Sequence, residues 1–272
     1  MDILKTDGIM FKKIQKMKGV VRMTGIILHL LLPLFTYTLT TTFLYLAVPI
    51  EPLLATGLSA ALNIPVLLWI YFYDQKRRGY SPSESRKPGS GLIFIFLLGA
   101  SLCILGNSIV ELMGLTRISK AYQEAANALY TPPIVIQLAA SGFIIPAAEE
   151  LIFRGMIFAS LRDKFSFGLS AVVSAGLFGL YHGNLPQGVY AFLIGLTAAW
   201  LYERTKALLA PCMLHISANL FSLFITNTKL SDFLFQREHA VVTAAVIAAA
   251  VVVTAICFVR IYRKNNLKED IV

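Results

Sequence analysis

The chain has 272 residues, of which 57% are hydrophobic and 14% are charged, and its formal net charge is +9. Soluble globular domains carry about 25% charged residues, so this composition excludes an ordinary soluble domain as well as a disordered chain. The basic residues gather beside long apolar runs, which is typical of membrane proteins. The positive charge therefore needs no nucleic-acid partner, and none is predicted.

Uncharged runs long enough to cross a bilayer begin near the N-terminus. A helix that spans the hydrocarbon layer needs about 20 apolar residues. Residues 1–22 form a basic tail, and the uncharged run 23–50 is longer than the ~7–15 apolar residues of a signal peptide, so we expect it to be retained as the first helix. The runs 52–73 and 88–110 predict two more helices, which complete an N-terminal unit of three over residues 23–113.

The middle of the chain predicts an interfacial connection and three further spans. Residues 115–133 form the longest external connection, and we expect a short helix along the membrane interface there. A fourth span is predicted at 137–161. The uncharged run 165–202 is too long for one helix, and Gly183–Gly188 predicts the turn between a fifth and a sixth span, because Gly, Asn and Pro favour reversals. Three glycines near the end of the fifth span should let a neighbouring helix approach closely: Gly176, Gly179 and Gly183.

Two more uncharged runs, 207–228 and 239–259, predict the seventh and eighth spans. The fold class predicted is an all-α polytopic membrane protein, a bundle of about eight transmembrane helices. Residues 130–226 form its predicted core, and residues 239–272 form the last helix with a C-terminal tail.

The basic residues alternate between the two sides of the predicted bundle. Short loops rich in Lys and Arg stay in the cytoplasm, so both termini are predicted to be cytoplasmic. On this side we count 19 basic residues: Lys5, Lys12, Lys13, Lys16, Lys18, Arg22, Lys76, Arg77, Arg78, Arg86, Lys87, Arg162, Lys164, Arg204, Lys206, Arg260, Arg263, Lys264 and Lys268. The opposite side holds four: Arg117, Lys120, Lys229 and Arg237.

Three ionisable side chains interrupt the fourth predicted span: Glu149, Glu150 and Arg154. An ionised group at bilayer depth costs at least ~2.5–3.5 kcal/mol on insertion scales, and such groups usually face a bundle interior or a watery cavity. Residues four apart share a helix face, so Glu150 should pair with Arg154, either as a structural lock or as part of a catalytic site. Glu149 should diverge from Glu150 by about 100° and face the histidines.

Two histidines lie in other predicted spans. His182 ends the fifth span, and His215 lies in the seventh, where Asn219 shares its face. Glu149 lies near the centre of its span, and a turn recessed below the lipid surface would bring His182 towards it.

These residue types allow two forms of amide hydrolysis, and both stay open. Glu149, His182 and His215 are the ligand types that hold a catalytic zinc with one position free for water. Without metal, the carboxylate could take a proton from water while His215 and Asn219 donate hydrogen bonds to the oxyanion. The sequence contains no Gly-x-Ser-x-Gly motif, and its cysteines have no paired or metal-type spacing, so they are interpreted as packing residues.

Taken together, three motifs resemble the CAAX-protease and bacteriocin-processing family of intramembrane proteases, also called Abi, which includes the type II CAAX prenyl endopeptidase. The motifs are Glu149-Glu150-x-x-x-Arg154, Phe178-x-x-x-His182 and His215-x-x-x-Asn219. The resemblance covers roughly residues 130–226 and implies an intramembrane protease of a bacterial plasma membrane. It implies these roles: water-activating base for Glu149, a supporting pair for Glu150 and Arg154, a second water or metal ligand for His182, and the remaining ligand or oxyanion donors for His215 and Asn219.

Two other functions remain as alternatives. A non-catalytic scaffold or bacteriocin immunity protein could keep the same fold, and a transporter or proton relay would also need intramembrane Glu, His and Arg. The predicted partners are membrane lipids and a peptide or membrane-protein substrate. The short fifth span favours access to the site from outside the cell, whereas the resemblance to prenyl proteases favours access from the cytoplasm.

Overall fold

The structure is a computed structural model that describes residues 31–79 and 91–266, without the side chains of Arg237 and of residues 264–266. The predicted basic tail 1–22, the beginning of the first predicted span and the last residues of the C-terminal tail lie outside the described residues. Every regular element in the described part of the chain is helical, so the predicted all-α class is confirmed.

The elements follow one another with short connections. They are a helix at Leu31–Ala47, α2 (Pro52–Arg77), α3 (Leu92–Leu112), α4 (Leu115–Ile118), α5 (Lys120–Tyr130), α6 (Ile134–Gln137), η3 (Leu138–Ile144), α7 (Ile145–Glu150), η4 (Leu151–Phe158), α8 (Ala159–Arg162), α9 (Phe167–Tyr181), α10 (Leu185–Thr205), α11 (Leu209–Asn227), α12 (Leu230–Leu234), η5 (Arg237–His239) and α13 (Ala240–Asn266). The segments α6 to α8 form one continuous helix of 29 residues, Ile134–Arg162, in which η3 and η4 are π-helical.

Six described helices are long and apolar enough to cross a membrane: α2, α3, the α6–α8 helix, α10, α11 and α13. The helices Leu31–Ala47 and Phe167–Tyr181 are apolar but shorter, and they coincide with the first and fifth predicted spans. The chain is thus an integral, multi-pass membrane protein. The count of eight spans and the position of the termini stay predictions. The external connection contains the short helices α4 and α5, as expected.

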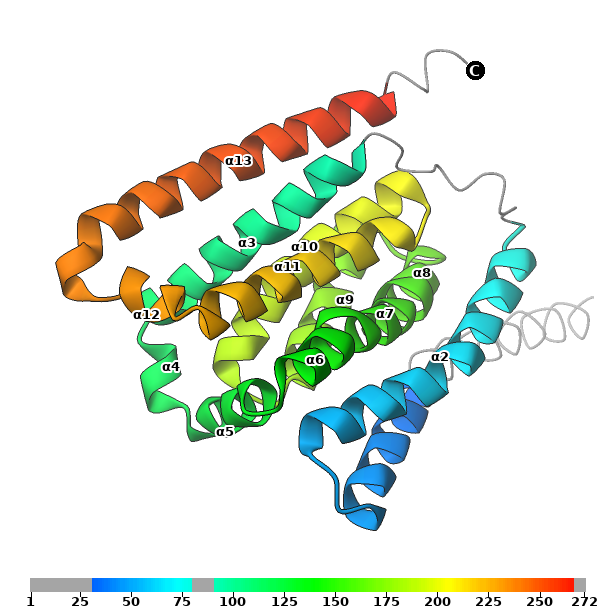
Figure 1. The fold of residues 1–272 in the computed structure, drawn as a ribbon. Helices are drawn as coiled ribbons and strands as arrows, with labels where there is room; N and C mark the ends of the chain where they lie inside the picture. The colour runs from blue at the N-terminus through cyan, green and yellow to red at the C-terminus, as the bar shows by residue number, and fades with distance from the viewer. Residues whose placement is uncertain (1–30, 80–90, 267–272) are drawn as a thin grey trace, which may run out of the picture.

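The helices are arranged around α10 and α11 (Figure 1). On one side α3 packs against both, and α13 packs on the outer face of α3. On the other side α9 and the α6–α8 helix follow, and α2 closes that edge together with the helix Leu31–Ala47. One buried apolar cluster joins α2, η4, α9 and α10, and a second joins α3, α10, α11 and α13. The α6–α8 helix, which carries the three ionisable residues, therefore lies inside the bundle.

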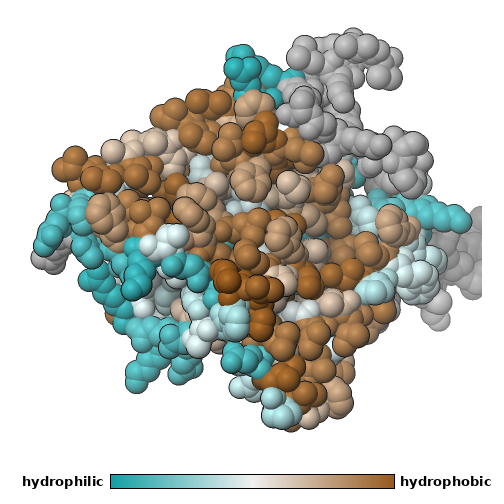
Figure 2. Space-filling view, viewed as in Figure 1, coloured by the Kyte–Doolittle hydropathy of each residue, from teal (hydrophilic) through white to brown (hydrophobic). Residues whose placement is uncertain are grey.

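The outer surface of the bundle is apolar, as a lipid-facing surface requires. Figure 2 shows hydrophobic residues across the middle of the molecule and polar residues towards the lower left, where α5 and α12 lie in Figure 1. Only 11% of the apolar part of α13 is buried, and side chains such as Val241 and Val252 are exposed.

The predicted turn between the fifth and sixth spans is shorter than expected. The prediction placed it at Gly183–Gly188, but α10 already begins at Leu185. Asn184 caps this helix, because its side chain accepts a hydrogen bond from the backbone N–H of Gln187 at 3.0 Å. Pro186 lies in the first turn of α10, where its missing N–H removes no helical hydrogen bond. Helix-breaking residues here therefore start a helix instead of extending a loop.

The close approach expected near the end of the fifth span occurs at one of the three glycines. A Cβ on Gly179 would lie 2.7 Å from the carbonyl oxygen of Gly188, so α9 and α10 come close only because glycine is there. Gly183 has a φ of +70° and forms the turn. A Cβ on Gly176 or Gly183 would meet nothing within 4 Å, so the expectation of a close approach is wrong for both positions.

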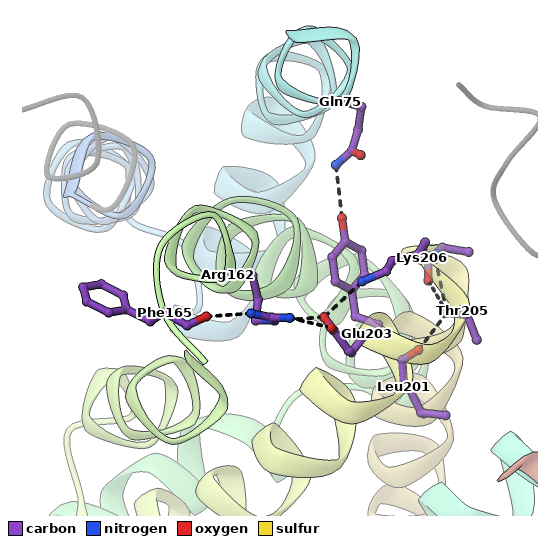
Figure 3. A network of polar contacts seen from close by, with 9 residues as sticks. Gln75, Arg162, Phe165, Leu201, Glu203, Thr205 and Lys206 are labelled. Atoms are coloured by element: carbon purple, nitrogen blue, oxygen red, sulfur yellow. Dashed lines mark hydrogen bonds and ion pairs between the residues drawn. The ribbon is translucent and has the colours of Figure 1, made fainter. Parts of the chain in front are cut away.

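A polar network holds the ends of α8 and α10 together (Figure 3). Arg162 donates two hydrogen bonds to the carboxylate of Glu203, at 2.9 and 3.2 Å, and Lys206 lies 3.1 Å from the same carboxylate. Gln75 of α2 donates to the hydroxyl of Tyr202 at 3.1 Å. Three spans are thereby tied together at the end that the charge pattern assigns to the cytoplasm.

Candidate active site

The helix that carries the glutamates is π-helical before and after them. The backbone N–H of Ile145 bonds to the carbonyl of Ala140, five residues back. In this register the carbonyl of Ser141 would bond to residue 146, which is a proline without an N–H. The side-chain amide of Asn219 on α11 donates to the Ser141 carbonyl instead, at 2.8 Å. One hydrogen bond thus satisfies a freed backbone group and fixes α11 against the glutamate helix.

Glu150 lies at the centre of a buried charged cluster. Nη1 of Arg154 donates to Oε1 of Glu150 at 3.0 Å, and Nδ1 of His215 lies 2.9 Å from the same oxygen. Glu150 and Arg154 are fully buried, and His215 is 5% exposed. Since a carboxylate only accepts hydrogen bonds, Nδ1 of His215 carries a hydrogen here. Glu150 therefore holds both a cation and the ring of a histidine from another helix.

Arg154 has a close-fitting environment beyond Glu150. Its guanidinium carbon lies 4.6 Å from the ring centre of Phe178, at cation–π distance. A Cβ on Gly195 of α10 would lie 2.9 Å from Nη2 of Arg154 and 3.0 Å from Cβ of Ala175. Glycine at position 195 therefore makes room for the guanidinium between α9 and α10.

Glu149 points away from this pair, into a cavity. Its Oε2 lies 3.8 Å from Nε2 of His215, too long for a direct hydrogen bond. Glu150 does not line the cavity, so the two adjacent glutamates do diverge. We expected Glu149, and not Glu150, to face the histidines. His215 instead lies closer to Glu150 than to Glu149.

His182 reaches the cavity from the C-terminal end of α9. Its Nδ1 lies 2.9 Å from the carbonyl oxygen of Phe178, which can only accept, so Nδ1 is the protonated nitrogen in the neutral ring. The ring of Phe178 meets His182 edge-on at 4.9 Å and His215 at 5.5 Å between centres. Phe178 thus orients both histidines and also faces Arg154, which explains the spacing of four between Phe178 and His182.

The cavity brings together four of the six predicted site residues. It has a volume of about 220 Å³, and Glu149, His182, His215 and Asn219 line it, whereas Glu150 and Arg154 lie behind it. The rest of its wall is mostly apolar or aromatic, with Tyr122, Tyr130 and Tyr190 among the largest side chains.

The three predicted zinc ligands are not placed as a metal site. In the described part of the chain no three His, Cys, Asp or Glu side chains form a group that could hold a metal ion. Nδ1 of both histidines is engaged with Glu150 or a backbone carbonyl, so only Nε2 of each ring remains for a ligand. The present arrangement does not fit zinc, and the chemistry considered below uses the side chains of this chain alone.

Sequence reasoning missed three residues that shape the site. Gly195 and Ser141 carry no signal that separates them from other small helical residues. Tyr37 of the helix Leu31–Ala47 is fully buried, its ring lies 6.2 Å from that of Tyr181, and its hydroxyl has no hydrogen-bond partner in the described part of the chain. Phe178 was part of the motif that ends at His182, but no role was predicted for it.

One part of the chain is similar to known proteins. Residues 131–221 match the family model described as "Type II CAAX prenyl endopeptidase Rce1-like". This segment, less than half of the chain, is similar to that family and is here called the Rce1-like segment. The resemblance seen in the three motifs is confirmed, and the Rce1-like segment falls within the predicted core 130–226, whose exact limits stay a prediction.

Two curated proteins are similar to the chain over this region. "Putative membrane peptidase YdiL" of Bacillus subtilis is 29% identical over 135 residues, which cover 50% of this chain and 54% of that protein. "UPF0177 protein YxdF" of Lactococcus lactis is 33% identical over 109 residues, which cover 38% of this chain and 56% of that protein. The chain thus spans a little over half the length of these relatives. No solved structure matches it.

Proposed function

We propose that the Rce1-like segment is an intramembrane endopeptidase that hydrolyses a peptide bond with water activated by Glu149. The observation that carries the proposal is the convergence of Glu149, His182, His215 and Asn219, from three helices, on one cavity inside an apolar bundle. A peptide bond meets water in the hydrocarbon region only in such a cavity.

His215 lies between two buried carboxyl groups. Its Nδ1 lies 2.9 Å from Oε1 of Glu150, and its Nε2 lies 3.8 Å from Oε2 of Glu149. In the proposed scheme His215 donates through Nδ1 to Glu150 and through Nε2 to the cavity.

The reaction can be written with these groups. Water lies between Glu149 and the unprotonated Nε2 of His182, and its oxygen attacks the carbonyl carbon while its proton passes to Glu149. The carbonyl oxygen becomes an oxyanion that accepts hydrogen bonds from Nε2–H of His215 and from the second amide hydrogen of Asn219. When the C–N bond breaks, Glu149 returns the proton to the leaving amine. The products are a carboxylic acid and an amine, and the proton of the acid then passes to the amine.

Glu150 and Arg154 act through His215 in this scheme. The carboxylate of Glu150 fixes the ring of His215 by its hydrogen bond to Nδ1, and Arg154 holds that carboxylate in place. Neither residue touches the cavity. Both are therefore positioning residues.

The test compares peptide termini in membranes from cells that carry the unchanged chain or Glu149→Gln. We expect the amide to abolish cleavage, because it cannot take a proton from water, and to leave the helix packing intact, because it keeps the shape of the side chain. Mass spectrometry of membrane and secreted peptides should therefore show termini that disappear in the variant.

The matched control is Glu203→Gln, the same change at the far end of the bundle. It should keep every terminus that the unchanged chain produces. If peptide profiles are identical for the unchanged chain and Glu149→Gln, while both proteins are folded and present in equal amounts, the chain is not a protease of this kind and the scaffold alternative stands.

A further inference from the structure

The cavity extends from the middle of the bundle towards one end. On α10 the lining residues run from Pro186 to Ile194, in the first half of the helix, whose other end carries Arg204. On α11 they run from His215 to Leu223, around the middle of the helix.

Two other spans agree. On α3 the lining residues are Asn107 and Val110, near its C-terminal end. On the α6–α8 helix they are Ser141 and Ile145, in the half remote from Arg162, and Glu149, at the middle of the helix.

The opposite end of the bundle carries the basic residues. Among the residues whose side chains the structure describes they are Lys76, Arg77, Arg78, Arg162, Lys164, Arg204, Lys206, Arg260 and Arg263. Most of the network in Figure 3 belongs to this end. At the cavity end acidic side chains are as frequent as basic ones: Glu51, Glu111, Glu124, Asp232 and Glu238 against Arg117, Lys120, Lys229 and Arg237. Since short basic loops stay in the cytoplasm, the cavity belongs to the outer half of the membrane.

We infer that the cavity opens to the extracytoplasmic side beneath α5 and receives a polypeptide segment exposed at the outer face of the membrane, with an uncharged apolar side chain beside the scissile bond. The claim that a bond is cleaved rests on the proposed function, whereas the side of access follows from geometry and charge alone.

The helix α5 forms the wall between the cavity and the outside. Tyr122, Ala126, Leu129 and Tyr130 line the cavity, and their spacing of four, three and one places them on one helix face. Residues on the other face, such as Glu124, are exposed. The helix has no fully buried residue, so it is held more weakly than the spans beneath it.

The surface that α5 presents to the cavity is uncharged. Burial raises the pKa of Tyr122 above its ordinary value, and the neighbouring Tyr130 and Glu111 raise it further, so this hydroxyl is neutral at physiological pH. With Tyr190, Val110 and Leu53, it makes the part of the cavity away from Glu149 aromatic and aliphatic. An apolar residue of the substrate is the side chain that this wall accepts without leaving a buried charge unpaired.

The test measures from which side water reaches the cavity, with a cysteine at Ser222, which lines the cavity from α11. The background carries Cys212→Ala, because Cys103 and Cys257 are buried and Cys212 is the remaining cysteine. The probe is methanethiosulfonate ethylsulfonate, a small anionic thiol reagent that does not cross membranes. It is applied to intact bacterial cells and, separately, to inverted membrane vesicles.

Two matched cysteines mark the sides: Lys229→Cys at the cavity end and Lys164→Cys at the basic end, both exposed positions. We expect Ser222→Cys and Lys229→Cys to react in intact cells and to be protected in inverted vesicles, and Lys164→Cys to show the reverse. Reaction of Ser222→Cys only in inverted vesicles, or from neither side, would overturn the inference.

The same variants separate this inference from the proposed function. Labelling does not require catalysis, so the pattern should be the same when Glu149→Gln is added to Ser222→Cys. Outer labelling with no cleavage in the peptide assay would keep the side of access and remove the protease. Inner labelling together with cleavage that depends on Glu149 would keep the protease and remove outer access.

Discussion

The buried guanidinium of Arg154 depends on a single missing methyl group. A side chain at position 195 would collide with Nη2 of Arg154 and with Ala175, and neither can move far inside a close-packed interior. Gly195, which has no side chain, therefore determines whether the guanidinium of Arg154 fits between α9 and α10.

Gly195→Ala should destabilise the protein by about 1–3 kcal/mol, the usual cost of overpacking a core. It should also slow any cleavage that depends on Glu149, because a displaced Arg154 no longer holds Glu150 under His215. Thermal unfolding of the purified protein in detergent measures the first effect. Gly176→Ala is the control, since a Cβ there meets nothing within 4 Å. Equal melting temperatures for the two variants would show that position 195 has room to spare.

A charge pair at the site should matter more than a charge pair at the surface. Glu150→Gln leaves Arg154 buried without a counter-charge, and breaking such a pair costs about 3–5 kcal/mol. Glu203 is 24% exposed in its bridge to Arg162, so Glu203→Gln should cost about 0–1 kcal/mol. Chemical denaturation of both variants under the same detergent conditions gives the comparison. A larger loss for Glu203→Gln would contradict the assignment of Glu150 as the centre of the buried cluster.

At the scale of elements, the π-helical register explains why Asn219 is needed on α11. The carbonyl of Ser141 has no helical partner because residue 146 is a proline. Loss of the Asn219 amide leaves a buried carbonyl unsatisfied.

A double-mutant cycle tests this link between two helices. Asn219→Ala should destabilise the protein by about 1–3 kcal/mol, the cost of an unsatisfied buried acceptor. In a Pro146→Ala background the new N–H of residue 146 can bond to Ser141, so the cost of Asn219→Ala should fall. Asn227→Ala is the control. Asn227 also joins α11 to the Ile134–Arg162 helix, by a hydrogen bond to Gln137 that involves neither Ser141 nor Pro146. The same cost for Asn219→Ala in both backgrounds would disprove the coupling.

The fold was predictable from sequence where one physical signal dominates. Long uncharged runs locate the helices, and the spacing of Glu150 and Arg154 places both on one face. The turn before α10 was predicted too long, because Gly, Asn and Pro act as a cap as well as a break. Contacts between helices far apart in sequence, such as His215 with Glu150 or Gly195 with Arg154, have no local signature. They depend on crossing geometry, which a single sequence does not encode in any periodic pattern.

At the scale of the whole molecule, the polar groups at the two ends of the bundle have different roles. One end binds three spans through the network around Glu203, and the other holds the cavity beneath a weakly held helix. The network joins α2, α8 and α10, whereas α5 has no fully buried residue. We therefore expect local opening to occur first at the end with α5.

The buried cluster also constrains how the protein is made. The helix Ile134–Arg162 carries Glu149, Glu150 and Arg154, but the groups that surround them, on α9, α10 and α11, are synthesised later. Each charge costs at least ~2.5–3.5 kcal/mol in lipid alone. We therefore expect this helix to settle in the membrane together with α9, α10 and α11, once α11 delivers His215.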